Sequence, residues 1–169
     1  NHHVVTMLGT EANTNFYVVD GKWQSSYVPM NIQRYPFDVR PDGDKLGVFF
    51  DENSDLIGAE GAERLFTDEG EPSEFLNNRQ QMLSELANSE MMTQKFVKQV
   101  VELGLLDPVE INLTYQEGQS RNVTGMLTIN EKKLRELDDE VILEMHKNGF
   151  LGAIYATMLS LSQVNRLIE

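Results

Sequence analysis

The chain has 169 residues, no cysteine and a formal net charge of −13, because 27 acidic residues outnumber 14 basic ones. This length suits one domain whose core forms without covalent staples. The lack of cysteine excludes disulfides, thiolate zinc sites and cysteine nucleophiles within these residues, and the acidic balance argues against nucleic acid or an anionic membrane surface as a partner.

The first part of the chain predicts short antiparallel strands joined by tight turns. Asp20-Gly21 is a strong two-residue turn signal after NFYVV. The stretch PDGD at 41–44 carries the proline, aspartate and glycine of a turn between PFDVR and KLGVFF. We therefore predict an N-terminal antiparallel β meander, followed by a loop over residues 51–73, which are rich in Asp, Glu and Gly.

A pair of helices is expected next. Ser73 is predicted to cap the first helix, and a second helix is predicted to begin near Ser89 or Thr93 and to end at Gly104. The apolar positions of the two helices are Phe75, Leu76, Met82, Leu83 and Leu86, then Phe96, Val97, Val100 and Val101.

The last third of the chain predicts a hairpin and then helices. Apolar and polar residues alternate over 109–115, which indicates a half-buried strand, and 121–129 is its expected partner. Asn130 and Asp138 or Asp139 are expected to open short helices, and Asn148-Gly149 is expected to precede the last helix. Strands followed by helices imply an α+β fold, which we expect to be a single domain over 1–169.

No familiar catalytic or metal-binding motif is present. Asp51, Asn53 and Asp55 alternate as in an EF-hand loop, but Ala62 stands where the bidentate glutamate belongs, so a structural loop is favoured. His146 stands alone near a predicted helix C-terminus, where an interaction with the helix dipole is favoured over a metal site. We predict no catalytic residue, no metal and no cofactor.

The stretch from Ser25 to Val39 is the strongest candidate site. Pro29 and Pro36 are expected to hold the chain in a rigid, extended connection. An arginine among aromatic rings can stack on a ring or clamp a carboxylate, which suits a small anionic or sugar ligand, or a protein partner. The alternative is that the rings fill the core while the arginine pairs with a local carboxylate. The predicted ligand-binding residues are Trp23, Tyr27, Arg34, Tyr35 and Phe37.

Several stretches resemble the bacterial SapC family in order and spacing. They are GKWQSSYVPMNIQRYPF, LFTDEGEPSEFL, LGLLDPVEINL, GMLTINEKKLREL and HKNGFLGAIYATMLSLSQVNRL. The resemblance covers nearly the whole chain, from Val5 to Leu167, although family members usually carry a further N-terminal segment. The residues that match the most recognisable family motif are Tyr27, Pro29, Arg34, Tyr35, Pro36 and Phe37.

The resemblance implies an accessory role. The family is named for a surface-layer association in a Gram-negative pathogen, and its genes often lie beside those for outer-membrane receptors and for halogenase-like and cupin-like proteins. Members are often labelled peptide-transport permeases, but the longest apolar run here, 149–162, is shorter than the ~20 residues of a membrane span.

We therefore expect a soluble, non-catalytic accessory protein in nutrient uptake or surface processes. It would bind a small molecule or a protein partner, without nucleic acid and without a membrane span. No signal peptide is visible and the chain has no cysteine, so we expect a cytoplasmic location. The chain begins at Asn1 without a methionine, which leaves export open. The broad apolar surface of the last helix leaves both a homodimer and burial within the monomer open. The alternative functions are an enzyme that uses His146 with carboxylates, and a surface-layer structural protein.

Overall fold

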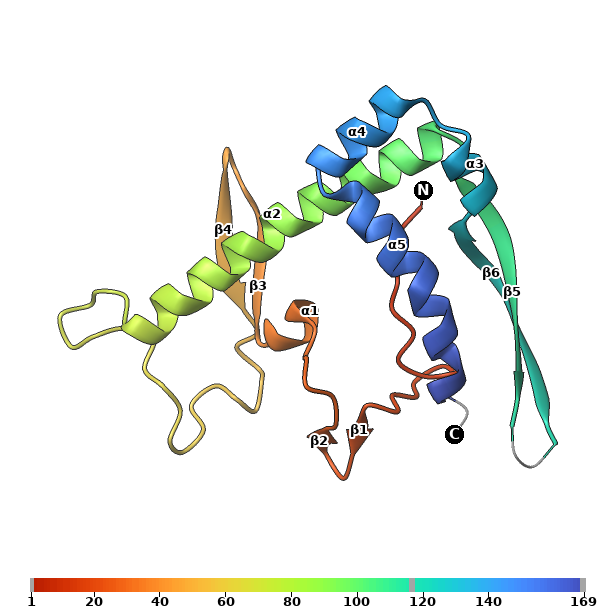
Figure 1. The fold of residues 1–169 in the computed structure, drawn as a ribbon. Coiled ribbons are helices and arrows are strands. Elements are labelled where there is room, and N and C mark those ends of the chain that lie inside the picture. The colour runs from red at the N-terminus through yellow and green to blue at the C-terminus, as the bar shows by residue number, and fades with distance from the viewer. Residues whose placement is uncertain (1, 116–117, 168–169) are drawn as a thin grey trace. The chain divides into compact units, whose positions relative to one another are not determined.

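The computed structural model describes residues 2–115 and 118–167. The chain divides into two compact units, one formed by Asn1–Gln24 with Gln94–Glu169 and the other by Ser25–Thr93. The α+β class is confirmed, since small antiparallel hairpins, one long helix, a further hairpin and C-terminal helices follow one another (Figure 1). The single-domain organisation stays a prediction.

The first unit contains two hairpins and the C-terminal helices. Its strands are β1 (Val18–Val19), β2 (Lys22–Trp23), β5 (Leu106–Thr114) and β6 (Ser120–Ile129). Its helices are α3 (Glu131–Arg135), α4 (Asp139–Lys147), α5 (Phe150–Ser160) and the 3-10 helix η1 (Leu161–Leu167). Strands β5 and β6 form a long antiparallel ribbon (Figure 1). The turn predicted between β1 and β2 is confirmed, because Asp20 and Gly21 both have positive φ, at 50° and 73°.

The second unit contains a short helix, a hairpin and the first part of a long helix. These elements are α1 (Met30–Gln33), β3 (Phe37–Asp42), β4 (Lys45–Phe50) and α2 (Glu74–Glu102). The boundary between the two units falls within α2, between Thr93 and Gln94. The β3–β4 turn is also confirmed, since Asp42 pairs with Lys45 and Gly43 has a φ of 61°.

The predicted β meander is wrong, because the described strands form three separate two-stranded sheets, β1–β2, β3–β4 and β5–β6. Helix α1 stands between β2 and β3 and also replaces the predicted extended connection. Pro29 starts this turn rather than preventing it, since its carbonyl accepts hydrogen bonds from the N–H groups of Ile32 and Gln33. Proline fits the start of a helix because no N–H is required there.

The predicted pair of helices is also wrong, because α2 is continuous from Glu74 to Glu102. Thr93 does not cap a new helix; its hydroxyl donates to the Ser89 carbonyl at 2.9 Å, one turn back in the same helix. The ends of the long helix agree with the prediction. The Leu76 N–H donates to the Ser73 hydroxyl at 3.2 Å, and Gly104 follows the last turn with a φ of 65°.

Each unit has its own apolar core. The core of the first unit is centred on Leu105, Met145 and Ile154, each fully excluded from solvent. In the same core the centres of the Phe96 and Phe150 rings lie 5.6 Å apart. The smaller core of the second unit consists of Phe37, Leu76 and Leu83, with Val39, Leu65, Phe75 and Met82 packed around it. Among residues 2–115 and 118–167, no helix is both long and apolar enough to cross a membrane.

One buried polar atom in the first unit is a source of instability. The Thr128 hydroxyl oxygen on β6 is buried and has no hydrogen-bond partner among the residues that the structure describes. A buried hydroxyl without a partner costs free energy, because folding removes its hydrogen bonds to water.

We expect Thr128→Val to raise the free energy of unfolding by about 1–3 kcal/mol, the desolvation penalty of an unpaired polar group. Urea denaturation of the variant and the parent measures this difference in the free energy of unfolding. The matched control is Thr124→Val, at an exposed position of the same strand, which should leave stability nearly unchanged. A Thr128→Val variant less stable than the parent would show that the hydroxyl is satisfied in solution.

Candidate functional site

The candidate site lies on strand β3, whose residues alternate between two faces. Phe37 is 6% exposed and belongs to the core of its unit, with its ring 6.2 Å from the ring of Phe75. Val39 packs against the same core. Asp38 and Arg40 therefore project from the opposite face of the strand, away from this core.

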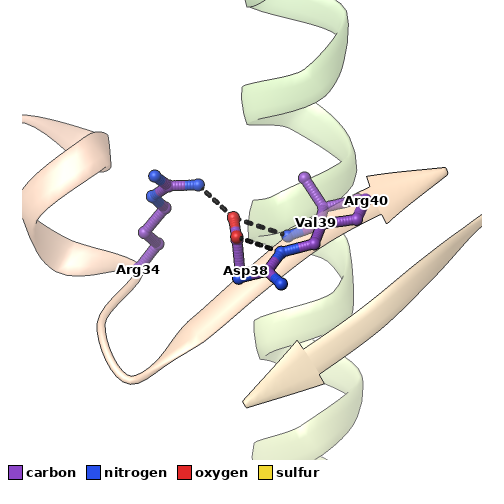
Figure 2. A network of polar contacts seen from close by, with 4 residues as sticks. All are labelled: Arg34, Asp38, Val39 and Arg40. Carbon is purple, nitrogen blue, oxygen red and sulfur yellow. Dashed lines mark hydrogen bonds and ion pairs between the residues drawn. The ribbon is translucent and has the colours of Figure 1, made fainter. Parts of the chain in front are cut away.

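Asp38 is the centre of a small polar network (Figure 2). The Arg34 guanidinium donates to Oδ1 of Asp38, and the Val39 N–H donates to the same oxygen at 3.0 Å. The Arg40 Nε–H donates to the other carboxylate oxygen at 2.7 Å. One carboxylate thus holds two guanidinium groups, one from the segment before the strand and one from the strand itself.

These donors lower the pKa of the Asp38 carboxyl below its ordinary value of 3.8. The hydrogen bond from Arg40 is the largest cause; burial opposes it, and the charge of Arg34 and the Val39 N–H act in the same direction as Arg40. The carboxylate is therefore ionised at neutral pH.

A cavity of about 510 Å³ lies beside this network. Its lining includes Arg34, Tyr35, Phe37, Arg40, Phe49 and Phe50. The Arg40 guanidinium carbon lies 5.9 Å from the centre of the Phe49 ring, within reach of a cation–π interaction. Two carboxylates, Asp38 and Asp51, also line the cavity. The site thus combines paired guanidinium groups with aromatic walls.

Three of the five predicted site residues line this cavity, namely Arg34, Tyr35 and Phe37. Tyr35 is 56% exposed, whereas Phe37 is mainly a core residue. Tyr27 is exposed in the same unit but is not among the lining residues. Trp23 belongs to the other unit, where its ring stacks on Tyr17 at 5.6 Å. The alternative to a binding site was that the rings fill the core while Arg34 pairs with a local carboxylate. The ion pair of Arg34 and the burial of Phe37 agree with this alternative, but the exposed ring of Tyr35 does not.

The sequence prediction missed Asp38, Arg40 and Phe49. The predicted strand could have indicated two of them. Alternate residues of a strand share a face, which places Asp38 beside Arg40. The tight turn at Gly43 sets the pairing of the two strands, which brings Phe49 opposite Asp38. Extending the strand prediction through its turn would have added these side chains to the candidate site.

The other candidates do not form a comparable site in the described part of the chain. His146 is exposed in the last turn of α4 and lines neither this cavity nor the one described below. No group of three or more His, Cys, Asp or Glu residues among the described residues could hold a metal ion. In the acidic loop, the Asp51 side chain accepts a hydrogen bond from the Asn53 N–H at 3.0 Å, a local turn.

Comparison with known families gives one match. The SapC family model matches residues 1–167, which confirms the resemblance seen in the sequence. No curated protein and no solved structure matches the chain.

We expect Asp38→Asn to lower the free energy of unfolding at pH 7 by about 1 kcal/mol, the upper end for a partly exposed ion pair. A carboxyl whose folded pKa is depressed stabilises the protein above its unfolded pKa, and this contribution is lost as the pH falls through the folded value. The difference between variant and parent should therefore shrink as the pH falls below 3.8, as followed by urea denaturation at several pH values.

The control for this prediction is Asp68→Asn. Asp68 pairs with Arg64 four residues earlier, as Asp38 does with Arg34, but the side chains of Arg64 and Asp68 are 77% and 86% exposed. This control should have little effect at any pH. A destabilisation by Asp38→Asn that stayed constant from pH 7 to pH 3 would contradict an electrostatic role.

Proposed function

We propose that this chain, which belongs to the SapC family, is a non-catalytic accessory protein that binds a small anionic ligand in the cavity beside Arg34. The observation that carries this proposal is the pair of guanidinium groups on one carboxylate beside an open aromatic wall. A role in bacterial nutrient uptake or in cell-surface processes rests on the family resemblance alone.

The paired arginines retain donors for a ligand. Arg34 gives one terminal nitrogen to Asp38, and Arg40 gives its Nε–H. A guanidinium carries five N–H donors in a fixed plane, so each group keeps donors suited to a carboxylate or phosphate. Asp38 meanwhile restrains both side chains, which lowers the entropy lost when a ligand binds.

The aromatic wall adds apolar area for the body of the ligand. Tyr35, Phe49 and Phe50 are 56%, 41% and 47% exposed, so each ring keeps surface that a ligand would remove from water. Apolar burial contributes about 25 cal/mol per Å². The combination favours a ligand with one anionic group on a ring-shaped or planar body, such as a sugar acid or an aromatic acid.

The net charge of −13 does not exclude an anionic ligand. At physiological salt, charges farther away than a Debye length of ~8 Å are largely screened. The groups within that range decide the local field, and the cavity is lined by two guanidinium groups and two carboxylates. The charges that line the cavity therefore sum to zero, and an anion that contacts the arginines is affected by these charges more than by the net charge of the whole chain.

The test is a thermal-shift comparison of benzoate, glucuronate and glucose. We expect at least one of the two acids to raise the melting temperature, because a ligand that binds only the folded state at 100 times its Kd adds about 2.7 kcal/mol. Arg34→Ala should abolish this shift. Arg64→Ala should retain it, because Arg64 forms the corresponding pair four residues from Asp68 in the same unit but does not line the cavity.

Three results would overturn the proposal. The first is that neither acid raises the melting temperature, and the second is a shift that Arg34→Ala leaves intact. The third is a shift with glucose as large as that with glucuronate, which would show that the guanidinium groups do not select the anion.

A further inference from the structure

The first unit contains a second cavity, of about 360 Å³, with a different chemistry. Its walls come from N-terminal residues 2–5, from α2 beyond the unit boundary, from the start of β5, from β6, and from the end of α5 with the start of η1. The apolar side chains in these walls include Val4, Phe96, Val100, Leu106, Met126 and Leu161. We call it the apolar cavity.

Among the described residues, no Asp, Glu, Lys or Arg lines the apolar cavity, although 27 residues of the chain are acidic. Two of its lining hydroxyls form hydrogen bonds within helix α5, whereas the Thr128 hydroxyl on β6 has no partner among the described residues. The Thr157 hydroxyl donates to the Ala153 carbonyl at 2.8 Å, and the Ser160 hydroxyl donates to the Thr157 carbonyl at 2.7 Å. On the α5 side both hydroxyls therefore already donate a hydrogen bond. Among the described residues that line the cavity, the only ionisable side chains are those of His2 and His3.

A bulge in β6 leaves room in another wall. The pairing of β5 with β6 shifts between Val109 and Ile111, and Gly125 lies there with a φ of 83°. Gly125 lines the cavity without a side chain, and an added Cβ would meet nothing within 4 Å. The positive φ favours glycine here, so the space is a consequence of the backbone itself.

We propose that the apolar cavity binds the single unbranched hydrocarbon chain of an amphiphile, with the polar head group in solvent. The volume of 360 Å³ lies at the low end of small-ligand pockets, ~300–1,000 Å³. At about 30 Å³ per water-sized group it holds roughly a dozen non-hydrogen atoms, which is a chain of about ten carbons with its first head-group atoms.

The apolar cavity suits a small molecule better than a folded partner. A stable protein interface needs about 800 Å² on each partner, usually with a polar rim, whereas this cavity is a local depression whose described lining has no Asp, Glu, Lys or Arg. Residues 2–5 form one of its sides, and Val4 and Val5 remain 56% and 61% exposed there. A hydrocarbon chain against this side would cover apolar surface that now faces water.

The experiment is calorimetric titration of the protein with decanol below its solubility limit and with decanoate below its micelle concentration. We expect at least one of them to bind with a negative change in heat capacity, the signature of apolar burial. Ser160→Phe should weaken binding about tenfold, because a ring in the cavity excludes roughly two methylene groups. Decanol and decanoate distinguish a neutral from an anionic head group, and binding of either one that persists in Arg34→Ala supports the proposal.

Ser162→Phe is the matched control. Both serines are exposed, and each donates its hydroxyl to the carbonyl three residues earlier, but Ser162 does not line the cavity. Ser162→Phe should bind decanol or decanoate with the affinity of the parent protein. Arg34→Ala should do so as well, because Arg34 lines only the anionic site of the other unit. Melting curves of both phenylalanine variants confirm that they are folded.

Three outcomes would overturn the proposal. The first is the absence of binding by both decanol and decanoate, and the second is an equal loss of affinity in Ser160→Phe and Ser162→Phe. The third is self-association of the free protein that Ser160→Phe abolishes, because a second copy of the chain would then be the occupant.

Discussion

The candidate site depends on the alternation of side chains along β3. Phe37 must enter the core of its unit, because its ring packs near Phe75 and little of it is exposed. The next residue, Asp38, is therefore held on the opposite face, where Arg34 and Arg40 both donate to it. The same burial that stabilises the strand thus positions a carboxylate that orients two guanidinium groups beside a cavity.

The features predicted from the sequence are those that local chemistry decides. The turn at Gly43 and the capping hydroxyl of Ser73 depend on residues within a few positions of each other, and both were predicted. The interrupted helix was wrong because the Thr93 hydroxyl can cap a helix or bond back within one. The meander was wrong because the choice of a strand's partner depends on packing between distant segments, which turn signals do not encode.

The site was predicted in part for the same reason. Arg34 was identified because arginine among aromatic residues has a specific chemistry, but Asp38 and Arg40 become partners only through the strand geometry. Trp23 is near in sequence and yet belongs to the other unit, where Tyr17 stacks on it. The two cavities also differ in kind: one has paired charges and rings, and the described lining of the other has no Asp, Glu, Lys or Arg. No sequence motif marks the second, because its walls come from five separate segments.

The most direct test of the central claim is an NMR titration of the Asp38 carboxyl carbon in the parent protein and in Arg40→Gln. If Asp38 holds both guanidinium groups, its pKa in the parent lies below the ordinary 3.8, and removal of the charged Arg40 donor, the largest cause of the shift, moves it upward. A parent pKa at or above 3.8 that Arg40→Gln leaves unchanged would contradict the account, because the arginines would then be free of the carboxylate in solution.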